Sequence, residues 1–153
     1  MTVEEILHNK GNYVFRVKEN DKVFKVFDIF EERKIGSCMV ENEKNEIVGI
    51  MTEKDLLKCF RKRLDRSEIE VKDLMTEQKN LIIGHLEDDI QYAMSVMTNK
   101  RIKHLPIFKD KKLVGLLSIG DVVKAQMEHS NQVAKTYLDL LLGKVPQSEN
   151  MEF

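Results

Sequence analysis

A hydroxyl side chain followed three positions later by an aspartate occurs twice in this chain, each time inside the same nine-residue frame. The frame reads GIMTEKDLL over residues 49–57 and GLLSIGDVV over residues 115–123. A hydroxyl that ends a strand and opens a helix lies among unpaired backbone N–H groups at the positive end of the helix dipole, which suits a phosphate. An aspartate one turn into the helix can accept two hydrogen bonds from a ribose diol. The spacing therefore predicts two phosphate-and-ribose pairs: Thr52 with Asp55, and Ser118 with Asp121.

The same residues also fit a purely structural role at the start of a helix. In a capping box, the hydroxyl accepts from a backbone N–H and the acid three residues later bonds back to the cap. TEKD at 52–55 matches this pattern, whereas SIGD at 118–121 matches it only in part, because Gly120 weakens the start of a helix. On the motif alone, capping and ligand binding have equal weight, so the surrounding residues must decide.

The second copy supplies cations that the first copy lacks. Arg101, Lys103 and His104 lie in KRIKHLPIF, on the strand that precedes the second frame, and such side chains bind phosphate oxygens. The matching stretch of the first copy, IGSC, contains Gly36 and Ser37, which allow close backbone approach but carry no charge. We therefore expect two unlike half-sites.

Both frames belong to a repeat that covers most of the chain. In each copy an apolar stretch, starting at Tyr13 or Asn80, precedes an amphipathic helix whose apolar residues fall at i, i+3, i+4 and i+7 from Val23 or Ile90. Two apolar strands joined by a short charged turn then lead into the frame and its helix. This order, strand-helix-strand-strand-helix, predicts an α+β fold with two small mixed sheets, each with two packed helices, related by a pseudo-two-fold axis.

The repeats define the expected domains: repeat 1 at residues 1–66, repeat 2 at residues 67–128, and a C-terminal helix and tail at residues 129–153. A unit of roughly 60 residues has a thin core and gains by burying its sheet against its twin. The cleft between the two halves is then the favoured place for a small ligand.

The tail carries an apolar stripe of its own. Val133, Tyr137 and Leu141 recur at a spacing of four, and Gly143 and Pro146 end the segment. The stripe needs a surface to pack on, and either the body of the protein or a partner subunit fits this need.

Composition and charge argue against several classes of function. The 25 basic and 26 acidic residues leave a net charge of -1, which gives no general attraction to nucleic acid or to a membrane. No apolar run of membrane-spanning length and no signal-peptide pattern occurs, so we expect a cytoplasmic protein. Cys38 and Cys59 have no metal-ligand spacing and are expected to be buried free thiols, and the four histidines show no metal or catalytic pattern.

These motifs together resemble a pair of CBS domains, the family named after cystathionine β-synthase. The resemblance rests on KRIKHLPIFKDKKLVGLLSIGDVV in the second copy and IGSCMVENEKNEIVGIMTEKDLL in the first, and it extends from about Thr2 to Lys124. The chain is most similar to the small stand-alone CBS pairs of bacteria and plant organelles. The resemblance implies a regulatory module that binds AMP, ADP, ATP, NAD(H) or S-adenosylmethionine between the repeats, and that forms a disc-shaped homodimer through its helices.

The resemblance also implies roles for particular residues. The hydroxyl of each frame contacts phosphate and the aspartate contacts ribose. Main-chain groups of two further segments hold the base. One segment is Gly36, Ser37 and Cys38, and the other is Lys103, His104, Leu105 and Pro106. The residues around Tyr13 and around Ile82 also contact the base. Lys54 and Lys103 stand where relatives often have arginine, so the charge is kept and the bidentate geometry is lost.

The sequence therefore predicts a non-enzymatic sensor of adenine nucleotides that acts on a partner protein, with no catalytic cofactor. Two alternatives stay open: a regulator that binds S-adenosylmethionine, and a ligand-free scaffolding homodimer in which the frames serve only as helix caps. An enzyme acting on nucleotides is disfavoured, because the sequence shows no evident general base, nucleophile or metal-binding motif.

Overall fold

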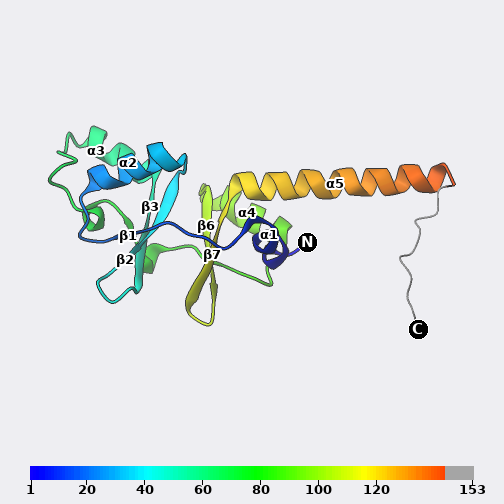
Figure 1. Cartoon of the computed structure of the whole chain (residues 1–153), viewed down its shortest axis with the longest axis horizontal. Helices are drawn as coiled ribbons and strands as arrows, with labels where there is room; N and C mark the ends of the chain where they lie inside the picture. Colours follow the sequence, from blue (N-terminus) through cyan, green and yellow to red (C-terminus); the bar gives the residue numbers. More distant parts are fainter. Residues whose placement is uncertain (144–153) are drawn as a thin grey trace.

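Two small mixed sheets form the body of the molecule, and helices flank each of them (Figure 1). The computed structural model describes residues 1–143. The first half contains α1 (Val3–Lys10), β1 (Arg16–Lys18), α2 (Val23–Arg33), β2 (Ser37–Glu41), β3 (Ile47–Thr52) and α3 (Glu53–Arg61). The second half contains η1 (Val71–Asp73), β4 (Thr76–Glu77), η2 (Gln78–Asn80), β5 (Gly84–His85), α4 (Ile90–Lys100), β6 (His104–Lys109), β7 (Lys112–Ser118) and α5 (Ile119–Leu141).

The two sheets share one pairing pattern. One sheet has the order β1-β2-β3-β4 and the other has the order β5-β6-β7. In each, a parallel pair (β1 with β2, β5 with β6) is followed by an antiparallel pair (β2 with β3, β6 with β7). Irregular register interrupts both antiparallel pairs at matching places, between Val40 and Glu41 and between Ile107 and Phe108. The α+β fold and the internal repeat predicted from the sequence are confirmed.

The two predicted helix stripes face the two cores. Val23, Val26 and Phe30 of α2 are buried in one half, as are Ile90, Ala93 and Met97 of α4 in the other. Both helices end at a residue in the left-handed region, Lys34 at φ 52° and Arg101 at φ 53°. The chain therefore leaves each helix in the same way before it enters β2 or β6.

The first strand of each repeat is shorter than predicted. The apolar stretches from Tyr13 and from Asn80 were expected to be strands, but β1 begins only at Arg16 and β5 only at Gly84. Asn80 instead ends the 3-10 turn η2, and Tyr13 lies in a loop with 78% of its surface exposed. Apolar composition alone gave the position of these strands to within a few residues.

The opening segment of each repeat packs into the core of the other repeat. Val3, Ile6 and Leu7 of α1 belong to the core built around α4, β6 and β7. Val71 and Leu74 of the second repeat belong to the core built around α2, β2 and β3. Neither repeat therefore has a complete core without a segment of its twin, and the repeats are interlocked as well as adjacent.

Gly49 and Gly115, the first residues of the two frames, explain why the frame needs glycine. A Cβ at Gly49 would lie 2.5 Å from the backbone oxygen of Thr76, and a Cβ at Gly115 would lie 2.7 Å from the side chain of Leu7. In both cases the neighbour belongs to the segment contributed by the other repeat. The two glycines thus leave space for the segments that the repeats exchange, around Thr76 and around Leu7.

The last helix, α5, is one continuous element of 23 residues that extends well beyond both sheets (Figure 1). The predicted stripe falls on it, and Val133, Tyr137 and Leu141 are 41%, 65% and 84% exposed. The body of the protein therefore does not cover the stripe. Gly143, at φ 69°, follows the helix as predicted, and Pro146 lies outside the described residues.

Candidate functional site

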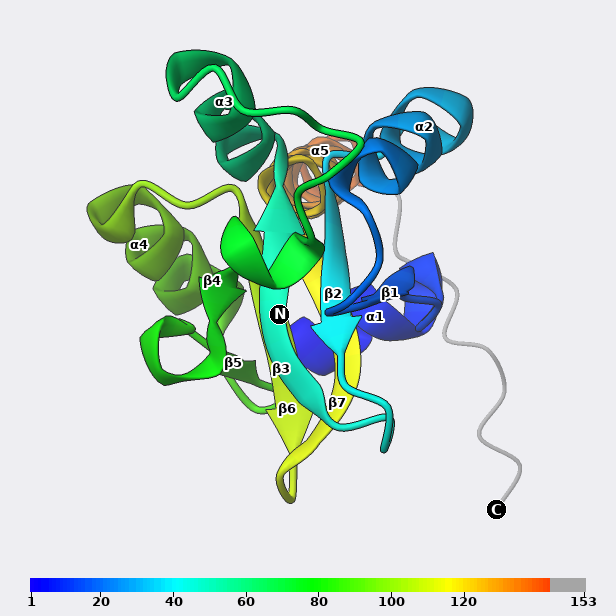
Figure 2. The same cartoon turned by 90° about the vertical axis from the view of Figure 1, so that its left-hand side faces the viewer.

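A cavity of about 630 Å³ lies at the seam between the two repeats. Its polar and charged lining comes from α3 and its N-cap, from the segment between the end of α4 and the start of β6, and from Thr76 and Asn80. Figure 2 shows α3 and α4 on the same side of the molecule. An apolar surface faces the same space. The lining residues are Gly36, Ile50, Thr52, Glu53, Lys54, Asp55, Leu57, Lys58, Thr76, Asn80, Leu81, Ile82, Lys100, Arg101, Ile102, Lys103, His104 and Pro106.

The first frame positions its hydroxyl and carboxylate at this cavity through a complete capping box. Thr52 is the N-cap of α3, and its Oγ1 accepts from the backbone N–H of Asp55 at 3.4 Å. Oδ2 of Asp55 accepts in return from the backbone N–H of Thr52 at 3.0 Å and from the Thr52 hydroxyl at 3.1 Å. Oδ1 of Asp55 accepts from Lys58 Nζ at 2.9 Å, so both oxygens of this buried carboxylate have partners.

The first turn of α3 offers fewer free donors than the sequence suggested. The backbone N–H of Glu53 donates to the carbonyl of Gly36 at 3.1 Å, and that of Asp55 donates to Thr52. Among the first three residues of the helix, this leaves the N–H of Lys54 as the donor without a partner within residues 1–143. A phosphate at this end of the helix therefore depends more on side-chain cations than on backbone groups.

Cations approach the cavity from both sides. Lys100 and Arg101 end α4, Lys103 precedes β6, and Lys54 lies in the first turn of α3. Within the described residues, none of these four side chains forms a salt bridge, whereas Lys58 is paired with Asp55. The cavity thus has a surplus of unpaired positive charge.

His104 lies at the seam, next to Gly36 and Glu53 of the first repeat. A Cβ placed on Gly36 would be 3.1 Å from Glu53 Oε1 and 3.5 Å from His104 Cε1. Burial lowers the pKa of His104, and the charges of Lys10 and Lys103 act in the same direction, while the nearby carboxylates oppose them. The imidazole is therefore held in its neutral form more strongly than an exposed histidine, and an anion beside it would favour the protonated form.

The second frame forms the same capping box but uses its aspartate differently. Ser118 Oγ accepts from the N–H of Asp121 at 3.1 Å, and Asp121 Oδ2 accepts from the N–H of Ser118 at 2.8 Å. The box that Gly120 was expected to weaken is therefore complete, and that prediction is wrong, because the cap bonds outweigh the low helix propensity of one glycine. Neither Ser118 nor Asp121 is among the residues that line the cavity.

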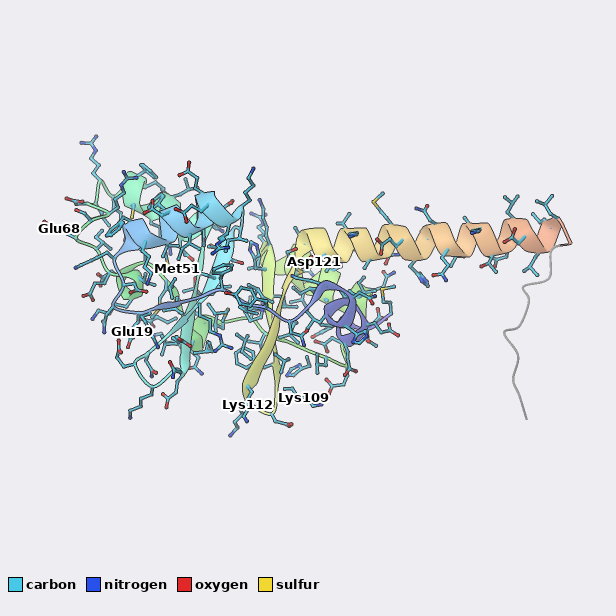
Figure 3. All side chains as sticks on the ribbon, in the orientation of Figure 1. Glu19, Met51, Glu68, Lys109, Lys112 and Asp121 are labelled. Atoms are coloured by element: carbon cyan, nitrogen blue, oxygen red, sulfur yellow. The ribbon has the colours of Figure 1, made fainter. Side chains whose placement is uncertain are left out.

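Lys10 of α1 is the partner that distinguishes Asp121 from Asp55. Its Nζ donates to Asp121 Oδ2 and also to the carbonyl of Leu116 at 2.6 Å. Figure 3 places Asp121 at the start of α5, beside α1. Burial raises the pKa of Asp121, but the hydrogen bonds from Lys10 and from Ser118, with the charge of Lys10, outweigh burial and hold this pKa below its usual value. The second carboxylate therefore ties the first helix of the chain to the last.

Eight of the fourteen sequence-predicted site residues line the cavity: Gly36, Thr52, Asp55, Ile82, Arg101, Lys103, His104 and Pro106. Three others are buried side chains on β2 and β6, namely Ser37, Cys38 and Leu105. Burial raises the pKa of Cys38 to about 12, so this thiol is a core residue, as expected. Tyr13 lies in an exposed loop. Ser118 and Asp121 are partly buried next to the cavity, because Ser118 pairs with His104 between β6 and β7, but they do not line it. The role of these three residues in binding stays a prediction.

Several lining residues were not singled out by the sequence reasoning. Lys58 and Lys100 are surface-type lysines on helices, and Glu53 lies between the two residues of the first frame. The sequence signal for these lining residues is the high density of charged residues in KDLLK and NKRIK. In the sequence alone, each segment is typical of a solvent-exposed helix face, and only the fold brings the two segments together. Lys10 was missed because its partner is 111 positions away.

The family of the chain follows from comparison with known proteins. The CBS domain model matches residues 3–62 and 71–128. The chain belongs to the CBS domain family. It is 31% identical over 142 residues to "CBS domain-containing protein CBSX3, mitochondrial" of Arabidopsis thaliana, covering 88% of this chain and 69% of that protein. It is also similar to the crystal structure of the CBS-domain containing protein ATU1752 from Agrobacterium tumefaciens, with 31% identity, a TM-score of 0.77, and coverage of 82% of this chain and 92% of that chain.

Other CBS proteins of the same fold have been solved with ligands. The CBS domain protein PAE2072 from Pyrobaculum aerophilum, complexed with AMP, shares 22% identity with a TM-score of 0.69, over 79% of this chain and 89% of that chain. The CBS domain pair of protein MJ0100, in complex with 5'-methylthioadenosine and S-adenosyl-L-methionine, shares 19% identity with a TM-score of 0.72, over 84% of this chain and 98% of that chain. At these identities the comparison establishes a common fold.

Similarity to one enzyme covers only a small part of that enzyme. Inosine-5'-monophosphate dehydrogenase of Staphylococcus aureus is 33% identical over 90 residues, which is 17% of that enzyme. Within residues 1–143, the His, Cys, Asp and Glu side chains form no group of three placed to hold a metal ion. No helix in the same range combines the length and apolar character needed to cross a membrane.

Proposed function

We propose that this CBS pair is a regulatory module that binds an adenine nucleotide in the cavity between its repeats. The observation that carries the proposal is the pairing, in one cavity of about 630 Å³, of an apolar surface with four unpaired cationic side chains. Cavities of several hundred cubic ångströms that combine apolar walls with a few convergent polar groups are typical of small-molecule sites. A nucleotide offers the complementary surfaces, because its base is flat and apolar and its phosphate is anionic.

The apolar wall supports the base end of this ligand. Ile50, Ile82 and Pro106 come from three different strands or strand-flanking segments and face the cavity together with Leu81 and Ile102. The neighbouring Asn80 adds an amide side chain that can both donate and accept hydrogen bonds. We therefore place the adenine here, against the second repeat.

Asp55 is the proposed ribose contact, and its bonding constrains how it can act. Oδ2 is held by the capping box, so a ribose hydroxyl must share Oδ1 with Lys58. The side chain of Lys58 is 40% exposed, and its Nζ also donates to the carbonyl of Leu74 at 3.4 Å. In this proposal the lysine turns away from both partners, toward solvent or toward a phosphate. Binding is then coupled to a change of partner at one carboxylate oxygen, and the helix cap stays intact.

Structures of distant relatives support an adenosine ligand in general terms. PAE2072 was solved with AMP, and the MJ0100 pair with S-adenosylmethionine and 5'-methylthioadenosine. We propose that the present chain likewise binds an adenosine-containing molecule, with AMP, ADP, ATP and NAD(H) as the candidates. In this proposal the module is not an enzyme, and its cytoplasmic location stays a prediction.

The regulatory output requires a second protein surface. We propose that the chain acts as a homodimer, since Leu57, Phe60 and Tyr92 on α3 and α4 and Met127 on α5 expose apolar side chains. A ligand shifts such an assembly only through its different affinities for two shapes, an effect of typically about 1 to 3 kcal/mol. A partner protein that recognises one of the shapes would read the change.

A scaffolding role is the second candidate, and the completeness of both capping boxes favours it. Both frames fulfil a structural purpose with every bond formed inside the chain. In this alternative the cavity binds no nucleotide and the chain contributes only its surface. Titration with ligands separates the two candidates.

Isothermal titration calorimetry with AMP, ATP, NADH and S-adenosylmethionine is the direct test, and neighbouring isoleucines provide matched variants. Ile82 lines the cavity, whereas Ile83 is 42% exposed and is not part of the lining. We expect Ile82→Gln to weaken adenylate binding by about tenfold, as the loss of about 1.4 kcal/mol of apolar contact implies, and Ile83→Gln to leave it unchanged. Absence of heat with every adenylate at millimolar concentration would favour the scaffold.

A further inference from the structure

We infer that the cavity selects among adenosine ligands by charge, preferring di- and triphosphates to the monophosphate and disfavouring the cationic S-adenosylmethionine. This inference rests on the proposed function and specifies the ligand class of the same site. It follows from the balance of charge in the lining, which includes five cationic side chains and two carboxylates.

The carboxylates neutralise little of this positive charge. Asp55 is already paired with Lys58, within the same helix. Glu53 is exposed, and no salt bridge within the described residues joins it to Lys54, Lys100 or Lys103. The surplus is therefore available to a ligand, and an AMP phosphate, with about two negative charges, would leave part of it unmatched.

The cations are concentrated at one corner, which suits a chain of phosphates more than a single one. Lys100, Arg101 and Lys103 fall within four consecutive residues where α4 turns into β6. Lys54 approaches from α3, on the other repeat. Phosphates extending along this corner would meet side chains from both repeats, so a longer phosphate chain would also hold the repeats together more firmly.

The corresponding corner of the first repeat has less free charge. Lys34, which stands where the second repeat has Arg101, is its one cation between α2 and β2 without a salt bridge or cation–π contact within the described residues. Arg33, at the end of α2, lies 5.4 Å from the centre of the Phe15 ring in a cation–π contact. Gly36 stands where the second repeat has Lys103, and the nearby Lys10 is bound to Asp121. The cluster of three unpaired cations is thus a property of one corner and not of the repeat as such.

Charge selection predicts different affinities for two ligands that share the methylthioadenosine group. S-adenosylmethionine carries an aminocarboxypropyl group on its sulfur, which makes the sulfur a sulfonium cation and adds an ammonium and a carboxylate that cancel, whereas 5'-methylthioadenosine has a neutral thioether. Near several unpaired cations the sulfonium is repelled. We therefore expect 5'-methylthioadenosine to bind more tightly than S-adenosylmethionine, and ATP to bind about tenfold more tightly than AMP at low salt, with a gap that narrows as salt is added.

The test is calorimetry of the wild-type chain with AMP, ADP, ATP, S-adenosylmethionine and 5'-methylthioadenosine in magnesium-free buffer. The double variant Arg101→Ala/Lys103→Ala is matched by Lys109→Ala/Lys112→Ala, which removes two exposed lysines from the far tip of the β6–β7 hairpin (Figure 3). The first variant is expected to reduce the ATP-to-AMP ratio to about twofold or less and to leave 5'-methylthioadenosine affinity unchanged. The second is expected to change neither.

Two results would overturn the inference in distinguishable ways. Equal affinity for AMP and ATP, with S-adenosylmethionine as good a ligand as its thioether analogue, would disprove charge selection and leave the nucleotide site in place. Equal weakening of every ligand, including 5'-methylthioadenosine, by Arg101→Ala/Lys103→Ala would also disprove it. Absence of binding by all five adenosine compounds would disprove the proposed function itself.

Discussion

The two copies of the nine-residue frame form the same helix cap, but their aspartates pair with different lysines. In both, a hydroxyl and an aspartate close a capping box at the start of a helix. Asp55 is paired with Lys58 on its own helix and borders the cavity, whereas Asp121 is paired with Lys10 from the opposite end of the chain. The repeated residues therefore specify a structural element, and the neighbours of each copy determine what else it can do.

The glycines that open the two frames differ in a similar way. Gly49 faces the backbone of Thr76, which cannot move without disturbing the β3–β4 pairing, whereas Gly115 faces the flexible end of the Leu7 side chain. The contact of the first repeat with Thr76 is therefore rigid, whereas the contact of the second repeat with Leu7 can adapt.

The largest expected effect is on stability, at the glycines. Gly49→Ala forces a methyl group against a backbone oxygen and is expected to lower the free energy of unfolding by about 3 kcal/mol. Gly115→Ala can be accommodated by a change of the Leu7 rotamer, at a cost of about 1 kcal/mol. Urea denaturation of both variants measures the difference. Equal losses would show that the two exchanges are equally rigid.

A smaller difference is expected between the two aspartates. Asp55→Ala removes a carboxylate whose side chain is 5% exposed and that accepts three hydrogen bonds from the cap and Lys58, so we expect a loss of about 2 kcal/mol. Asp121→Ala removes one whose side chain is 24% exposed, with an expected loss of about 1 kcal/mol. Urea denaturation again gives the answer, and the reverse order would contradict the account of the two caps.

The tie between Lys10 and Asp121 predicts a response to acid. Because the pKa of Asp121 lies below its ordinary value of 3.8, the tie stabilises the fold above that value, and the stabilisation is lost as the pH falls through the lower pKa of the folded state. Lys10→Met is expected to raise the pKa of Asp121 and to reduce the stability that the fold loses in acid. The change in the free energy of unfolding is expected to stay below about 1 kcal/mol.

Carboxyl NMR titration measures this pKa directly. Lys124→Met is the matched control, since Lys124 is also on the first turns of α5 but is paired with the exposed Glu128. An unchanged pKa of Asp121 in Lys10→Met would show that the lysine does not determine it.

Sequence reasoning predicted those features that depend on neighbours along the chain. The helix stripes from Val23 and Ile90, the cap at Thr52 and the buried Cys38 all follow from local spacing or residue type. The cations at Arg101 and Lys103 were also identified, because a run of charge next to an apolar strand is visible in the sequence.

The features that were missed depend on the exchange of segments between repeats. The position of Leu7 against Gly115, and of Lys10 against Asp121, requires α1 to cross to the second repeat. No periodicity within residues 1–10 specifies on which sheet that helix packs. The lining residues Lys58 and Lys100 were missed for a related reason, because they become neighbours of one cavity only when the repeats are assembled.

We propose that a nucleotide binds beside the first frame, whereas the cap and the Lys10 contact of the second frame stabilise the fold. The most direct measurement is the change in backbone amide chemical shifts when ATP is added to isotopically labelled protein. We expect the largest changes at Thr52–Asp55 and at residues 100–104, smaller changes at Ser118, which pairs with His104, and small changes at Lys10 and Asp121. Largest changes at Ser118 and Asp121, or no change at either frame in millimolar ATP, would contradict this proposal.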